Sequence, residues 1–148
     1  MASKNAIVLP LDFSELSEAA LPWARRMAAV LDAEVHCIFV VDYPHVYGSL
    51  DMTTPIAIPT AEEIAESIKG QLSAFVDKHL DGLKPAAIGK VLIGRPAEQI
   101  IEYAHDCDAA MIVMTTHGYG GVKHLVLGST TEAVLRHAEC PVLSIRSA

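Results

Sequence analysis

One stretch of the sequence decides the fold: Ala109-Ala-Met-Ile-Val-Met-Thr-Thr-His-Gly-Tyr-Gly-Gly-Val-Lys-His-Leu-Val-Leu-Gly-Ser-Thr-Thr-Glu132. It begins with an apolar run over residues 109–114, which predicts a buried strand. Three glycines follow within four positions, at Gly118, Gly120 and Gly121, and Gly128-Ser129-Thr130 then opens a predicted helix over residues 129–139. The stretch is therefore a strand, a glycine-rich loop and a helix in direct succession.

Four more apolar segments outside this stretch predict strands. They cover residues 6–11, 34–41, 86–93 and 141–146. Each is short and, in residues 34–41 especially, rich in β-branched side chains, as expected of strands buried in a parallel sheet.

Helical signals fill the intervals between the predicted strands. Ser14 is a candidate N-cap for a helix that Pro22 should kink, and Thr60-Ala-Glu-Glu63 is a capping box for a second helix. Pro96 stands at the first position of a third. Alternating strands and helices predict right-handed crossovers and an α/β fold, with helices on both faces of a mostly parallel sheet. This pattern leaves the strand order open.

The composition limits both size and partners. The chain has 148 residues, 51% of them apolar and 20% charged, which predicts one folded domain over residues 1–148. A net charge of −7 disfavours binding to nucleic acid. No apolar run approaches the roughly 20 residues of a membrane span, and the first residues lack a signal-peptide pattern, so we expect a cytoplasmic protein. The odd count of three cysteines, without a CxxC pair, predicts free thiols.

The glycine-rich loop has the features of a phosphate site. Glycine allows the backbone to approach a ligand closely, and a helix N-terminus offers unpaired N–H donors together with about half a positive charge. Ser129 and Thr130 add hydroxyl donors at that terminus. The segment matches neither a Walker A loop nor the dinucleotide fingerprint. The alternative is that its glycines serve only turns and caps.

Gly118, nine intervening residues and then Gly128-Ser129 resemble the nucleotide loop of the universal stress protein family. ATP-binding members of that family carry Gly-x-x-Gly, nine residues, and then Gly followed by Ser or Thr. Here Thr115 replaces the first glycine. The other segments that resemble the family are Pro10-Leu-Asp12-Phe-Ser14, Val40-Val-Asp42, Gly94-Arg-Pro96-Ala97, Leu127-Gly-Ser129 and Cys140-Pro-Val142-Leu143.

The resemblance implies an open five-stranded sheet in the order 3-2-1-4-5, with ATP or a related adenine nucleotide at the ends of strands 1 and 4. It places Pro10 and Asp12 at the adenine and ribose end, and the backbone of Val40 at the adenine edge. The residues implied at the phosphates are Gly118, Gly121, Gly128, Ser129 and Thr130, with Thr115 near the ribose and first phosphate. For Asp12 the sequence leaves a second interpretation, a cap on the following helix.

We expect no protein-only metal site, because the seven histidines form no ligand cluster, although Mg or Mn could arrive bound to the phosphates. The leading functional hypothesis is a stress-response regulator that binds a nucleotide. The alternatives are a dimeric interaction protein that binds none and, with less support because no base or basic finger is evident, a slow ATPase. We also expect a homodimer joined through the last strand, from Pro141 to Arg146.

Overall fold

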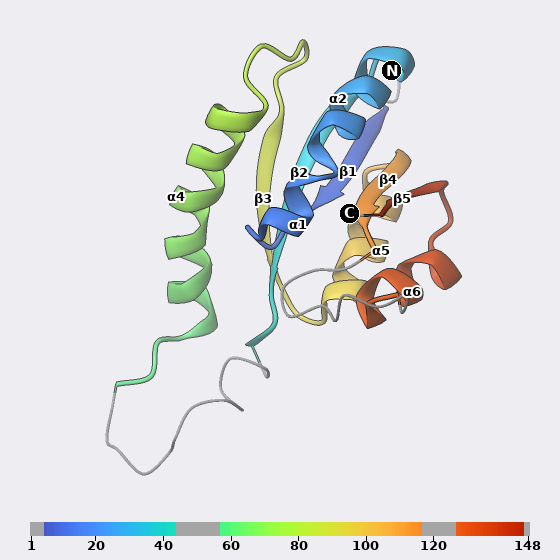
Figure 1. The fold of residues 1–148 in the computed structure, drawn as a ribbon. Helices are drawn as coiled ribbons and strands as arrows, with labels where there is room; N and C mark the ends of the chain where they lie inside the picture. The colour runs from blue at the N-terminus through green and yellow to red at the C-terminus, as the bar shows by residue number, and fades with distance from the viewer. Residues whose placement is uncertain (1–4, 44–56, 117–126, 147–148) are drawn as a thin grey trace.

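The protein is a five-stranded parallel sheet with helices on both faces (Figure 1). The structure is a computed structural model that describes residues 5–43, 57–116 and 127–146. Its strand order, β3-β2-β1-β4-β5, confirms the fold class and the order implied by the resemblance. The strands are β1 (Ala6–Pro10), β2 (Glu34–Val41), β3 (Ile88–Ile93), β4 (Ala109–Thr115) and β5 (Val142–Ile145).

Two helices cover each face of the sheet. The first face carries α2 (Leu21–Leu31) and α4 (Ala61–His79), and the second carries α5 (Pro96–Asp106) and α6 (Ser129–His137). The alternation of side chains along each strand divides the core accordingly. In β1, for example, Ile7 and Leu9 pack on the first face and Val8 on the second, all with no exposed surface.

The predicted kinked helix after Ser14 is two helices. The short α1 (Glu15–Glu18) ends at Ala19, and α2 begins at Leu21. Pro22 lies in the first turn of α2, where its missing N–H leaves no helical hydrogen bond unmade. Pro22 therefore starts a helix here and does not kink one.

Two large apolar side chains of the helices lie at the surface and not in the core. Trp23 is 39% exposed and Leu135 is 42% exposed. In α2 the buried stripe consists of Leu21, Ala24 and Ala28, which leaves Trp23 to one side. Its ring carries the guanidinium of Arg26 at 5.2 Å from the centroid, a cation–π contact that keeps the ring partly covered.

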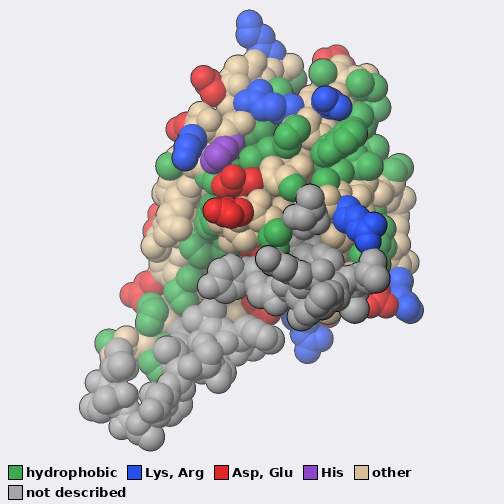
Figure 2. All heavy atoms as spheres, in the orientation of Figure 1, with side chains coloured by type: hydrophobic (Ala, Val, Ile, Leu, Met, Phe, Trp, Pro, Cys, Tyr) green, Lys and Arg blue, Asp and Glu red, His purple; other side chains and the backbone are tan. Residues whose placement is uncertain are grey.

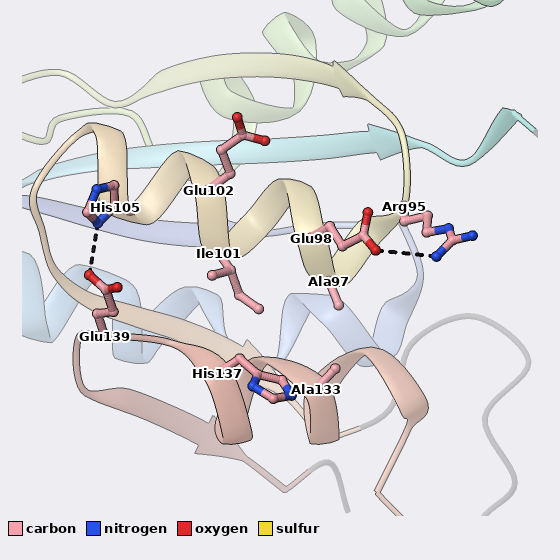
Figure 3. Close-up of a pocket in the computed structure, with 9 residues that line it drawn as sticks. All are labelled: Arg95, Ala97, Glu98, Ile101, Glu102, His105, Ala133, His137 and Glu139. Carbon is pink, nitrogen blue, oxygen red and sulfur yellow. Dashed lines mark hydrogen bonds and ion pairs between the residues drawn. The ribbon is translucent and has the colours of Figure 1, made fainter.

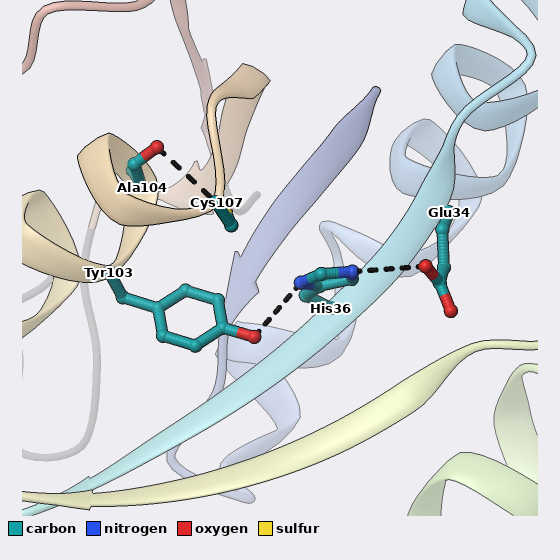
Figure 4. Close-up of polar contacts among 5 residues, drawn as sticks. All are labelled: Glu34, His36, Tyr103, Ala104 and Cys107. Carbon is teal, nitrogen blue, oxygen red and sulfur yellow. Dashed lines mark hydrogen bonds and ion pairs between the residues drawn. The ribbon is translucent and has the colours of Figure 1, made fainter. Parts of the chain in front are cut away.

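A buried polar contact joins β2 to α5 near the amino ends of the strands (Figure 4). His36 Nδ1 lies 2.9 Å from the Tyr103 hydroxyl, and Nε2 lies 3.3 Å from a Glu34 carboxylate oxygen. Both ring nitrogens are thus satisfied, and burial raises the pKa of Tyr103. His36 is a structural residue of the core.

The three cysteines are free, as the sequence predicts. Cys37 is fully buried, and its burial raises the pKa of the thiol to about 12. Burial also raises the pKa of Cys107 and Cys140. All three thiols therefore stay protonated at neutral pH, which makes them poor nucleophiles.

The described surface has two further general features. Among the described helices, none combines the length and the apolar character needed to cross a bilayer. On the face shown in Figure 2, Lys and Arg side chains are interspersed with acidic ones. That face therefore presents mixed charge and not a field of a single sign.

Candidate functional site

The strand order creates a topological switch point at the carboxyl ends of β1 and β4, the place where open α/β sheets form a ligand-binding crevice. These two strands are neighbours in the sheet. The helix α2 that follows β1 packs on the first face, whereas α6, which follows β4, packs on the second. The helices α2 and α6 therefore lie on opposite faces of the sheet (Figure 1), as expected at such a switch point.

The first wall of this crevice is the turn between β1 and α1. The Asp12 carboxylate accepts hydrogen bonds from the Ser14 N–H at 3.0 Å and from the Ser14 hydroxyl at 2.5 Å. Ser14 Oγ in turn accepts from the N–H of Ser17 at 3.1 Å, and it is the N-cap of α1. Capping was thus a correct interpretation of Ser14, and Asp12 supports the cap from outside the helix while remaining half-buried.

Phe13, between these two residues, has an unusual backbone conformation. Its φ is 62°, in the left-handed region that bulky side chains rarely adopt, at an expected cost of about 1–3 kcal/mol. Its ring stacks on Phe39 with centroids 4.9 Å apart and lies 5.7 Å from the ring of Phe75. Aromatic contacts of this kind contribute about 0.5–1.5 kcal/mol each beyond burial, enough to offset the strain. Nothing in the sequence signals this conformation.

The second wall is the start of α6, which two hydrogen bonds fix to the end of β4. Thr116 N–H holds that strand end to β5 by donating to the Ile145 carbonyl, and Gly128 N–H donates to the Thr116 carbonyl, each at 2.9 Å. The hydroxyl of the buried Thr131 donates to the Thr115 carbonyl, also at 2.9 Å. Thr131 was not among the predicted site residues, although threonine side chains near a helix start often bond to backbone.

Gly128 is the N-cap of α6, with φ −58° and ψ 147°. This conformation is open to any residue, so the backbone does not require glycine there. The advantage of glycine at residue 128 is that no side chain stands beside the N–H groups of the first helical turn, which have no partner within the helix. Ser129 is exposed and Thr130 half-buried in that turn, and the helix dipole adds positive potential.

The carboxyl end of β2 forms the third side of this switch point. Leu11 N–H donates to the Ile38 carbonyl at 2.8 Å, toward β1, and Gly94 N–H donates to the Val41 carbonyl at 3.0 Å, toward β3. Backbone groups alternate between the two sides of a strand, so those of Val40 point toward the side of β1. Since β1 ends at Pro10, the polar backbone of Val40 borders the crevice.

The structure brings most of the predicted residues to this one edge. Those it describes there are Pro10, Asp12, Val40, Thr115, Gly128, Ser129 and Thr130. Gly118 and Gly121, predicted at the phosphates, lie outside the described residues. Thr115 is buried at the end of β4, with 7% of its surface exposed. Within the described ranges no group of three or more His, Cys, Asp or Glu side chains is placed to hold a metal ion.

A second hollow lies between α5 and α6 and was not predicted (Figure 3). It has a volume of about 600 Å³ and an apolar floor that includes Ala97, Ile101 and Ala133. Across its rim the His105 ring lies 2.8 Å from the Glu139 carboxylate, and this hydrogen bond raises the pKa of His105. Two exposed ion pairs, Arg95–Glu98 and His105–Glu139, hold four of its charged groups, so we place the candidate functional site at the carboxyl edge of the sheet.

Comparisons with known proteins identify the family. A sequence model of the universal stress protein family matches residues 5–146. The chain belongs to the universal stress protein family. It is 34% identical over 145 residues to a universal stress protein of Methanocaldococcus jannaschii, a match that covers 95% of this chain and 81% of the relative.

Solved structures of universal stress proteins have the same fold. UspA of Lactobacillus plantarum superposes with a TM-score of 0.75 at 26% identity, over 99% of this chain and 100% of that one. A universal stress protein of Archaeoglobus fulgidus in complex with dAMP has a TM-score of 0.63 at 22% identity, over 98% and 99% of the two chains. A further universal stress protein structure, in complex with cAMP, has a TM-score of 0.65 at 18% identity, over 99% of this chain and 100% of that one.

Proposed function

We propose that this universal stress protein is a stress-response regulator that binds ATP or a related adenine nucleotide in the crevice between β1 and β4. One observation carries the proposal: the β1–α1 turn and the N-terminus of α6 face the same switch point of the sheet. The turn offers a carboxylate, and the helix start offers N–H donors and hydroxyls. A nucleotide has a nucleoside end and an anionic end that suit these two walls.

Each wall has a distinct role in this proposal. Backbone groups of Val40 read the edge of the adenine, and Asp12 accepts from a ribose hydroxyl, with Pro10 beside it. The phosphates lie against Gly128, Ser129 and Thr130, where no Cβ of residue 128 blocks approach. Gly118 and Gly121 join them from the loop. The complexes of structurally similar universal stress proteins with dAMP and cAMP support an adenine nucleotide as the ligand.

Any divalent ion in this site would be held mainly by the nucleotide. Mg²⁺ prefers phosphate oxygens and retained waters over an all-protein cage, and Asp12 belongs to the nucleoside end. We therefore expect Mg or Mn to bind with the phosphates, and ATP hydrolysis to be weak at most, because phosphoryl transfer needs a positioned base and strong charge neutralisation.

Thermal stabilisation by Mg-ATP tests the proposal directly. Ligand at a hundredfold excess over its dissociation constant stabilises the folded state by about 2.7 kcal/mol. For a chain of this size the melting temperature should then rise by roughly 5–10 °C. An unchanged melting temperature with millimolar ATP, AMP and cAMP, each tested separately on folded protein, contradicts nucleotide binding.

A matched pair of glycine variants locates the ligand. Gly128→Val adds a branched side chain at the start of α6 and should abolish the shift while the fold survives. Gly70→Val is the control, since Gly70 lies in α4 and a Cβ built there meets nothing within 4 Å. Equal nucleotide-induced shifts in both variants would place any ligand elsewhere.

The second candidate is an interaction protein of the same fold whose crevice binds no nucleotide. It is favoured by one residue, Thr115, which stands where the ATP-binding family pattern has glycine. Analysis of ligand released by denaturing the purified protein separates the two candidates, because a bound nucleotide appears in stoichiometric amount only under the first.

A further inference from the structure

Phe13 differs from the other described residues that have a positive φ without being glycine. Among the described residues, three that are not glycine have a positive φ: Phe13, Asp32 and Asp108. Asp32 is the C-cap of α2 and Asp108 follows the C-cap of α5, positions where a short polar residue commonly adopts this conformation. Phe13 instead precedes a helix and carries a large ring. Its conformation therefore needs a separate cause.

Two aromatic rings supply that cause. Phe39 of β2 stacks on the Phe13 ring with an interplanar angle of 21°, and Phe75 of α4 meets it at 58°. All three rings pack against the core cluster on the first face of the sheet. The ring of Phe13 is thus held by two elements that belong neither to β1 nor to α1. Because the ring is fixed, its backbone stays in the left-handed region.

The left-handed backbone determines where the Asp12 carboxylate lies. It turns the chain so that the carboxylate of Asp12 reaches both the N–H and the hydroxyl of Ser14, two residues later. The same hydroxyl oxygen accepts from Ser17 N–H and fixes the start of α1. A φ in the common negative range would direct residue 12 away from this arrangement.

We propose that Phe13 is a positioning residue of the nucleotide site, whose ring, held by Phe39 and Phe75, orients the Asp12 carboxylate toward the ribose. The inference rests on the proposed function. It assigns a role in binding to a side chain that packs in the core, and it makes Phe75 of α4 a remote contributor to affinity. Residues of strained backbone gather at ligand sites for this reason.

Two substitutions separate positioning from simple packing. Phe13→Leu keeps an apolar side chain but loses the stacked ring, so the backbone should leave the left-handed region. Phe13→Gly removes more packing, yet glycine adopts a positive φ freely. We expect stability to fall in the order Phe, Leu, Gly. Affinity for ATP or AMP, whichever the wild-type chain binds more tightly, should fall in the order Phe, Gly, Leu, with a loss of about tenfold for leucine.

The exchange rate of the Ser14 amide provides a readout without nucleotide. That N–H donates to Asp12, so its protection should drop in Phe13→Leu and be largely kept in Phe13→Gly. Phe75→Leu should weaken nucleotide binding, whereas Leu72→Ala, a change one turn earlier on the buried face of α4, should lower stability only.

The outcomes that overturn this inference differ from those that overturn the proposed function. A wild-type chain that binds no adenine nucleotide overturns both. Wild-type binding overturns this inference alone if affinity follows the same order as stability, or if the Ser14 amide stays equally protected in Phe13→Leu.

Discussion

Thr115 is the residue at which this chain departs from the ATP-binding pattern, and its position defines the test. It is buried at the end of β4, and its carbonyl accepts the hydroxyl of Thr131. That hydrogen bond uses the backbone, so it survives any side chain at residue 115. A substitution there probes the side chain without releasing α6.

We expect Thr115→Gly to preserve or improve nucleotide affinity. The change removes a Cβ where ATP-binding members have none, while glycine in a strand lowers stability by about 0.5–1 kcal/mol relative to alanine. Isothermal titration calorimetry measures the affinity, and urea unfolding measures the stability. The matched variants are Thr115→Val, which keeps the shape, and Thr115→Ser, which keeps the hydroxyl. A loss of more than about tenfold in the glycine and valine variants but not in serine would make the hydroxyl a ligand contact.

For single residues, the sequence shows which side chains are polar and near strand ends, but not the backbone conformation that orients them. Asp12 and Ser14 could be placed in the β1–α1 turn because both follow an apolar run. The left-handed φ of Phe13 could not, since contacts with Phe39 and Phe75, far away in the sequence, override its local preference. At Gly128 the residue type suggests an unusual backbone conformation, yet the observed one is open to any residue.

Among the elements, α6 is held to the end of β4 by one buried side-chain hydroxyl besides its backbone and apolar contacts. Thr131→Val keeps the volume of the side chain and removes the donor to the Thr115 carbonyl. We expect a loss of about 1–2 kcal/mol in the free energy of unfolding, because a buried acceptor loses its partner. Nucleotide affinity should fall as well, since the first turn of α6 is no longer fixed. Thr131→Ser retains the hydroxyl and should bind nucleotide as the wild type does. Unaltered nucleotide affinity in Thr131→Val would show that this hydrogen bond does not contribute to binding.

The contact between His105 of α5 and Glu139, which follows α6, should depend on pH. Its hydrogen bond with Glu139 raises the pKa of His105 above the ordinary value of 6.5. A raised pKa in the folded state means that the stabilisation is fully present below about pH 6.5 and is lost as pH rises through the folded-state pKa.

We therefore expect the difference in melting temperature between wild type and His105→Gln to be larger at pH 6 than at pH 9. Both groups are exposed, so the effect is small. His137→Gln is the control from the same hollow, a histidine with no ion pair among the described residues. A difference that is the same at both pH values would show that the pair does not stabilise the fold.

At the level of elements, the sequence predicts their order well and their ends less well. Apolar runs and caps located all five strands, and the Thr60–Glu63 capping box is present with both of its hydrogen bonds. The break between α1 and α2 escaped prediction because Ala19 and Ala20 are good helix formers. That break follows from tertiary packing: α1 follows the tight turn at Phe13, and α2 must lie along the sheet.

In the part of the chain that the structure describes, the sheet ends at β3 on one edge and at β5 on the other, and β5 is the edge that we expect to join two copies. β5 is the last strand in the sheet order and pairs with β4 on one side. An apolar edge with unpaired N–H and C=O groups invites pairing with another chain. A two-fold axis through this edge would let two β5 strands pair antiparallel and satisfy both.

The hydrogen bonds of β5 show which residues would form that interface. Ile112 N–H donates to the Pro141 carbonyl and Thr116 N–H donates to the Ile145 carbonyl, so residues 141 and 145 point their backbone toward β4. By alternation, Val142 and Ser144 direct their N–H and C=O groups to the outer edge. A proline at residue 142 therefore removes an outward donor, whereas a proline at residue 143 would remove an inward one and disturb the fold.

Light scattering at micromolar concentration should give twice the chain mass of 15.9 kDa for the wild type. Val142→Pro should shift the protein to monomer with circular dichroism unchanged, since proline is tolerated at an edge strand when its missing N–H faces outward. Ile93→Pro is a matched control at the other edge. Gly94 N–H donates to the Val41 carbonyl of β2, so by alternation the N–H of the exposed Ile93 in β3 faces outward. Its substitution should leave the dimer intact if β5 alone forms the interface. A wild-type monomer would contradict an interface at β5. A dimer that persists in well-folded Val142→Pro would assign the interface to another surface, and equal dissociation by both prolines would point to a loss of fold and not of an edge.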